Sequence, residues 1–122
     1  MRSKKDLTEQ QREVMAYLER YDVYRRILSG NRHARAYFRA KHEVLEARAD
    51  DALLRAKMTE IRRFVVTLPD CREKMLLYYR YIHGHSVDAC AEMMEVSRRT
   101  AFRIATDAIV FAADNFENRE TF

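Results

Sequence analysis

Five side chains that can donate hydrogen bonds to nucleic acid lie within seven consecutive positions near the C-terminal end of the chain. An arginine guanidinium can donate two parallel hydrogen bonds to N7 and O6 of guanine, and it can also bind a phosphate. Serine and threonine hydroxyls can bond to bases or to phosphates. The chemistry indicated is recognition of a polyanion. We call these residues the recognition cluster: Ser97, Arg98, Arg99, Thr100 and Arg103.

A second concentration of positive charge lies between Asp22 and Glu43, an interval without any acidic residue. Two interpretations stay open for it. Its side chains can contact phosphates beside a nucleic-acid groove, which adds a salt-dependent and sequence-independent term to affinity, or they can form a solvated helical face. We call these residues the basic segment: Arg25, Arg26, Arg32, Arg35, Arg39 and Lys41.

Residue types that bind metal ions or catalyse reactions are few and poorly spaced. Cys71, His83, His85 and Cys90 include zinc-type ligands, but the gaps between them match no close-paired cysteine or histidine pattern. The sequence holds no glycine-rich phosphate loop and no nucleophile elbow. We therefore expect no metal, no cofactor and no enzymatic activity, and we expect both cysteines to remain thiols.

Composition indicates a helical protein with a basic N-terminal half. The 122 residues carry 23 Lys and Arg, 19 Asp and Glu, and a formal net charge of +4. Residues 1–66 hold sixteen basic and ten acidic residues, whereas residues 67–122 hold seven and nine. Only two glycines and one proline occur, and the commonest residues favour helices. An all-α fold follows, and a chain of this length excludes a large enzyme with a deep cleft.

Apolar periodicity predicts two long helical segments in the N-terminal half. The first spans residues 7–28 and stops at Ser29, Gly30 and Asn31, where Gly30 can take the left-handed C-capping conformation. In the second segment, apolar residues recur at alternating steps of three and four, which is typical of one helical face. We call this face the seam: Tyr37, Ala40, Val44, Ala47, Asp51, Leu54, Met58, Ile61, Val65 and Leu68.

The seam also leaves two interpretations open. It can pack inside the chain as core, or it can pair with a helix of another molecule, either a second copy in a homodimer or a different protein. Asp51 is its polar exception, and Asp51 or Asp50 can cap a new helix that begins at Ala52. The continuity of the helix through these two aspartates is left undecided.

The C-terminal half predicts three further helices. Pro69 ends the seam segment, because proline cannot donate within a helix interior. Asp70 is the predicted N-cap of a helix that reaches Ile82, with Glu73 completing a capping box. Ser86 is the predicted cap of a short helix over residues 87–94.

A turn at residues 95–97 then leads to a last helix, capped by Ser97 and reaching about Asn115. These lengths are those of a helix-turn-helix. Ala91 supplies the small residue where its two helices cross, and Ala101 and Ala105 face inward. The arginines of the recognition cluster then lie on the exposed N-terminal end of the last helix, where such helices meet base edges.

Two runs in this half resemble a known family. The runs Arg80–Ser86 (RYIHGHS) and Ala91–Thr100 (AEMMEVSRRT) resemble the C-terminal helix-turn-helix of bacterial sigma factors, and more closely the small sigma-like regulators of phages and prophages. The resemblance covers about residues 66–112 and implies promoter or operator recognition together with contact to RNA polymerase. Cys90 stands where the family usually has isoleucine, and Glu95 where the turn often has glycine.

The sequence thus predicts an all-α protein with an N-terminal helical hairpin or long helix followed by a helix-turn-helix bundle. The predicted parts are an extension over residues 1–66, a sigma-like domain over 67–116 and a frayed tail over 117–122. The predicted function is cytoplasmic, sequence-specific recognition of double-stranded DNA in transcription regulation, without membrane association. The alternative is a helical interaction module that binds RNA polymerase or another partner through the seam, with a degenerate helix-turn-helix.

Overall fold

The computed structural model describes residues 7–30, 36 and 51–116, and the regular elements within these ranges are all helical. The predicted all-α fold is therefore confirmed. None of these helices is long and apolar enough to cross a membrane. The elements are α1 (Glu9–Ser29), α4 (Asp51–Val66), α5 (Arg72–Leu77), the π-helix η2 (Tyr78–Ile82), α6 (Val87–Met93) and α7 (Arg98–Asn115).

Helix α1 begins at a reciprocal capping pair. The Thr8 hydroxyl accepts from the Gln11 amide, and the Gln11 side chain accepts from the Thr8 amide, each at 3.1 Å. The helix ends within one residue of its predicted end. The prediction of a left-handed Gly30 is wrong, because Gly30 is extended at φ −75° and ψ 162°. Its N–H donates to the Arg26 carbonyl at 2.8 Å, so the chain leaves the helix without a left-handed residue.

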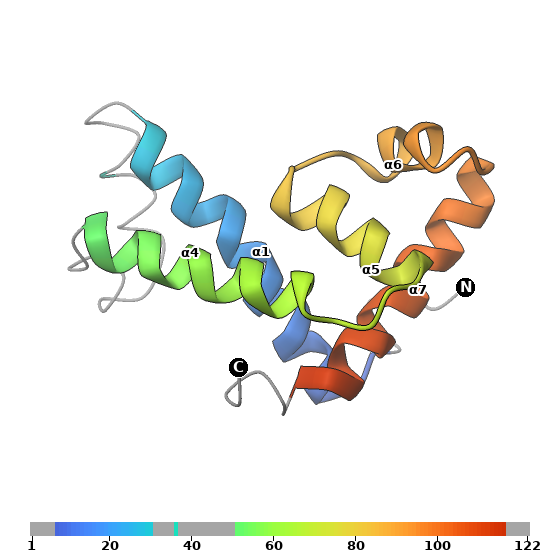
Figure 1. Ribbon diagram of the computed structural model, residues 1–122, viewed down its shortest axis with the longest axis horizontal. Helices are drawn as coiled ribbons and strands as arrows, with labels where there is room; N and C mark the ends of the chain where they lie inside the picture. The colour runs from blue at the N-terminus through green and yellow to red at the C-terminus, as the bar shows by residue number, and fades with distance from the viewer. Residues whose placement is uncertain (1–6, 31–35, 37–50, 117–122) are drawn as a thin grey trace.

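Helix α4 carries the seam residues from Asp51 to Val65, and three of them are core. Leu54, Ile61 and Val65 are between 0% and 1% exposed, and α4 packs along α1 with the chain running in the opposite direction (Figure 1). For these residues the interpretation as intrachain core is confirmed. The seam residues from Tyr37 to Ala47 lie outside the described residues, as does the chain just before Asp51.

Three aromatic rings join the N-terminal helices to the end of α7. Tyr17 of α1, Phe64 of α4 and Phe116 meet edge to face, with ring centroids 5.0 to 5.8 Å apart. A single hydrophobic cluster contains residues from both the predicted extension and the predicted sigma-like part. The C-terminal half of α7 is therefore held in the core, while its N-terminal half extends away from α1 and α4 (Figure 1).

The helix predicted to follow Asp70 differs from its prediction in where it begins and in the form of its last turn. It begins at Arg72 rather than after Asp70, and the Asp70 carboxylate accepts from Lys74 Nζ at 2.8 Å instead of capping the helix. The predicted capping box is therefore wrong. The helix does reach Ile82, but its last five residues form the π-helix η2, in which the His83 amide donates to the Tyr78 carbonyl at 3.1 Å. Such wide turns often occur at functional sites.

Candidate nucleic-acid interface

Helices α6 and α7 form the two-helix unit that the sequence predicts. The Ser86 hydroxyl accepts from the Ala89 amide at 3.1 Å and starts α6, as predicted. Ala91 is 5% exposed, and its carbonyl accepts from the Val96 amide at 3.0 Å, which closes the turn onto α6. Ala91 is thus buried in α6, and α6 packs against α7.

The turn between these helices depends on a left-handed residue. Glu95 has φ 57°, which makes it the non-glycine residue with positive φ in the described ranges. A side chain in this conformation costs roughly 1–2 kcal/mol, because Cβ approaches the following carbonyl oxygen. Glycine avoids this clash. The geometry therefore explains why glycine would suit the position, and it shows that Glu95 still makes the turn.

Ser97 caps α7, and its hydroxyl is engaged in doing so. Ser97 Oγ accepts from the Thr100 amide at 3.1 Å and donates to Thr100 Oγ1 at 2.9 Å. The predicted cap is confirmed. Since the Ser97 hydrogen is directed to Thr100, only Thr100 retains a hydroxyl hydrogen for a ligand.

Arg99 and Arg103 form the exposed face of the recognition cluster. They stand four residues apart, so they lie on one face of α7, and both side chains are exposed. Ala101 and Ile104, on the inward face, are 0% and 1% exposed. Within the described ranges, neither arginine makes an ion pair with the rest of the chain. Both guanidinium groups are thus available to an anionic or hydrogen-bonding ligand.

Arg98 is placed differently, because it has two neighbours inside the chain. Its Nε lies 2.7 Å from Asp88 Oδ1, and its Cζ lies 5.3 Å from the centre of the Phe102 ring. The side chains of Arg98 and Asp88 nevertheless remain 74% and 60% exposed. Sequence reasoning missed Asp88 and Phe102. The only local signal was an aspartate in the first turn of a helix, which is common for other reasons.

The charge at the start of α7 is unfavourable for the isolated helix. Its first turn contains Arg98 and Arg99 and no acidic residue. Cations near a helix N-terminus oppose the macrodipole, by about 0.3–1 kcal/mol each. A bound phosphate or another anion would relieve this opposition.

The two described members of the basic segment lie in α1 and are paired. Arg25 Nη1 donates to the Ile82 carbonyl at 3.2 Å, and Arg25 also pairs with Asp22. Arg26 Nε lies 2.8 Å from the second oxygen of Asp22. The guanidinium of Arg25 thus joins α1 to the end of η2. The other four members lie outside the described residues.

Gly84 allows this approach of Arg25. It has φ +76°, and a Cβ at this position would stand 2.6 Å from Arg25 Nη2. A side chain here would be strained by the backbone conformation and crowded by the guanidinium. The turn before α6 is therefore shaped around Arg25.

Each cysteine is a free thiol, and the two described histidine rings lie against each other. Cys90 is buried at 0% exposure, and burial raises the pKa of its thiol. His83 packs against Tyr78, and its ring lies 6.1 Å from the ring of His85. In the described part of the chain, no three histidine, cysteine or acidic side chains gather in an arrangement that could hold a metal ion.

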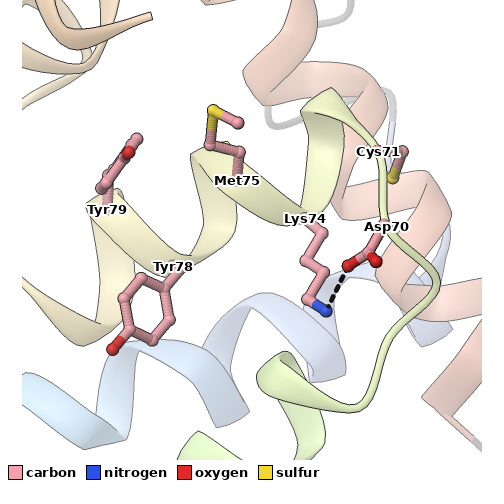
Figure 2. Close-up of a pocket in the computed structure, with 6 residues that line it drawn as sticks. All are labelled: Asp70, Cys71, Lys74, Met75, Tyr78 and Tyr79. Carbon is pink, nitrogen blue, oxygen red and sulfur yellow. Dashed lines mark hydrogen bonds and ion pairs between the residues drawn. The ribbon is translucent and has the colours of Figure 1, made fainter.

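An open pocket of about 580 Å³ lies along α5 and the start of η2. Figure 2 shows the ion pair between Lys74 and Asp70 at its edge. The hydrogen bond from Lys74 lowers the pKa of Asp70. None of the lining residues belongs to α6 or α7, so the pocket lies outside the recognition cluster. The residues that line the pocket are Asp70, Cys71, Lys74, Met75, Tyr78 and Tyr79.

Comparisons with protein families, with characterised proteins and with solved structures find no match to this chain. The interpretation of the site therefore depends on its own geometry and on the resemblance noted in the sequence.

Proposed function

We propose that this protein binds double-stranded DNA sequence-specifically and regulates transcription, with α7 entering the major groove. One observation carries the proposal. The N-terminal end of α7 directs Arg99 and Arg103 outward from a two-helix unit, while the other end of α7 is anchored in the core. A rigidly held helix that presents arginines at its start is suited to bond guanine edges and phosphates.

The placement of charge along α7 supports the same proposal. Arginines in its first turn oppose the helix dipole, so they lower the stability of the free protein slightly. Their opposition to the dipole disappears when an anionic ligand is bound. The resemblance to sigma-factor C-terminal domains adds the expectation that the DNA is a promoter or operator and that RNA polymerase is a partner.

The alternative of an interaction module that uses the seam has less support. In the part of the seam that the structure describes, a partner helix would need apolar side chains, but Leu54, Ile61 and Val65 are already covered by the chain itself. Exposing them would break the contact between α4 and α1. We therefore place the functional surface on α7.

Selection of bound sequences from random DNA duplexes tests the proposal. The protein is expected to enrich a defined motif and to bind it with steep salt dependence. Replacing either Arg99 or Arg103 by alanine should then cost about 1–3 kcal/mol of discrimination at one base pair if the arginine reads a base. If the arginine binds a phosphate, the substitution should weaken all duplexes alike and reduce the salt dependence.

Arg62→Ala serves as the matched control. Arg62 is exposed on α4, so this variant loses the same charge outside the two-helix unit. It should leave the motif unchanged and affect affinity little. Enrichment of no motif, or Arg99→Ala and Arg103→Ala variants that bind every duplex as tightly as the wild type, would contradict the proposal.

A further inference from the structure

Asp88 and Phe102 hold the guanidinium of Arg98 between the two helices of the unit. Asp88 lies in the first turn of α6 and meets Arg98 Nε at 2.7 Å, while Phe102 lies one turn further along α7 and meets the guanidinium carbon at 5.3 Å from its ring centre. An arginine over an aromatic face is attracted by the ring quadrupole. The side chain is thereby oriented while it stays 74% exposed.

This ion pair adds little to the stability of the fold. Ion pairs between exposed side chains contribute little to stability, because solvent screens them and both side chains lose freedom. Its geometry has a clearer consequence for a ligand. The contact to Asp88 is made through Nε, so the end of the guanidinium formed by the two Nη groups remains for hydrogen bonding.

The carboxylate also affects which ligand Arg98 can take. A phosphate placed at Arg98 would carry its negative charge close to Asp88, and like charges at such separation repel. A guanine edge is uncharged and offers two acceptors, N7 and O6, which match the two Nη groups. Asp88 therefore disfavours a phosphate contact and leaves the base contact possible.

We propose that Asp88 is a positioning residue that makes Arg98 read a guanine edge instead of the phosphate backbone. The inference depends on the proposed DNA-binding function and extends it to the choice of contact. Removal of Asp88 should have opposite effects on two quantities. It should lower discrimination at the base pair that Arg98 reads, and it should raise affinity for unrelated duplexes, because a negative charge is lost and Arg98 is free to reach phosphates.

The experiment uses the full chain and the duplex motif selected by the wild type. The base pair read by Arg98 is the one whose preference is lost in Arg98→Ala. Affinities of Asp88→Ala are then measured for the motif, for the motif changed at that base pair, and for an unrelated duplex. We expect the preference to fall about tenfold and the affinity for the unrelated duplex to rise. Asp88→Asn should retain part of the preference, since its amide oxygen can still accept from Nε.

Two controls separate the positioning of Arg98 from the general effect of removing a negative charge. Glu92 stands one turn further along α6, is exposed and makes no ion pair in the described part of the chain. Glu92→Ala should therefore raise the affinity for all duplexes alike and leave the preference unchanged. In the Arg98→Ala background, Asp88→Ala should change no base preference, because the residue it positions is absent.

The outcomes distinguish this inference from the proposed function. If Asp88→Ala leaves the preference unchanged, or weakens all duplexes by the same factor, Asp88 does not position Arg98 for base reading and the inference is overturned alone. If the wild-type chain shows no preference among duplexes, the proposed function is overturned and the inference with it.

Discussion

Two regions of the molecule contain arginines and use them in opposite ways. One is the contact between α1 and η2, and the other is the start of α7. In the first, Arg25 of α1 is held by Asp22 and by the Ile82 carbonyl, and its guanidinium lies against the turn at Gly84. In the second, Arg99 and Arg103 are exposed and bind no acidic group of the described chain. Arginine is thus a structural joint in the first region, where it links α1 to η2. In the second region its hydrogen-bond donors are available to a ligand.

The comparison shows why the amount of charge is a poor guide to a binding surface. The N-terminal half has the larger basic excess, yet Arg25 and Arg26, the two described members of its basic segment, share one carboxylate. The C-terminal half has a slight acidic excess, yet it presents unpaired arginines on one helix face. Availability of the guanidinium, which depends on its neighbours, separates Arg99 and Arg103 from Arg25 and Arg26.

The largest effect is expected from Arg25→Met, which tests the structural joint. The substitution keeps the apolar stem but removes the hydrogen bond to Ile82 and the ion pair to Asp22. Hydrogen bonds from charged groups contribute about 1.5–3 kcal/mol, so the free energy of unfolding should fall by about 2 kcal/mol. Chemical denaturation measures this loss.

The control for this prediction is Arg26→Met. Arg26 is 61% exposed and contacts the same carboxylate, so its substitution should change stability by less than about 0.5 kcal/mol. Equal losses in both variants would mean that Arg25 is no joint, and the contrast between the two regions would fail.

A pH-dependent effect is expected at the same contact. Burial, with the Glu19 carboxylate as a second cause, raises the pKa of Tyr81 to about 12. In the unfolded chain Tyr81 loses this proton near its ordinary pKa of about 10, so the folded state binds the proton more tightly than the unfolded state. The stability of the folded state therefore falls as pH rises from about 10 to about 12. Between about pH 9 and about pH 11, Tyr81→Phe should lose about 1 kcal/mol less stability than the wild type.

This effect is checked by denaturation at the two pH values and by ultraviolet titration of tyrosinate. The titration should show a late-titrating group that is absent in Tyr81→Phe. Identical pH profiles for the two proteins would show that Tyr81 does not experience the environment of this contact.

A smaller effect, which is an increase in stability and not a loss, is expected at the turn of the two-helix unit. Glu95→Gly relieves the left-handed strain but increases the freedom of the unfolded chain, so stability should rise by about 0.5–1 kcal/mol. Thermal and chemical denaturation measure the gain. Glu95→Val is the control, since a β-branched side chain is worse in this conformation and should destabilise the protein.

The smallest stability change is expected for Arg99→Ala. The exposed guanidinium opposes the helix dipole, so its removal should leave the unfolding free energy unchanged or raise it by up to about 0.5 kcal/mol. Binding to the selected duplex should nevertheless weaken, in contrast to the stability loss expected for Arg25→Met. A clear loss of stability in Arg99→Ala would show that this arginine, too, is part of the fold.

Local features of the chain were predictable because they depend on residues close in sequence. The caps at Ser86 and Ser97 and the last helix to Asn115 agree with the structure. The inward face of α7 agrees as well, since apolar periodicity reports burial directly. The Asp70 cap failed because a second local partner, Lys74, takes its carboxylate. The wide turn of η2 has no sequence signature that we could have used.

By itself, the sequence determined which segments are helical, where most of them start, and which residues stand at the beginning of the last helix, since hydrogen bonds and side-chain contacts within one turn decide these properties. Only the tertiary structure decided what each arginine meets. Arg98 reaches Asp88 ten positions away, and Arg25 reaches Ile82 fifty-seven positions away. Such contacts arise from helix packing, which brings distant side chains together with no trace in the local pattern.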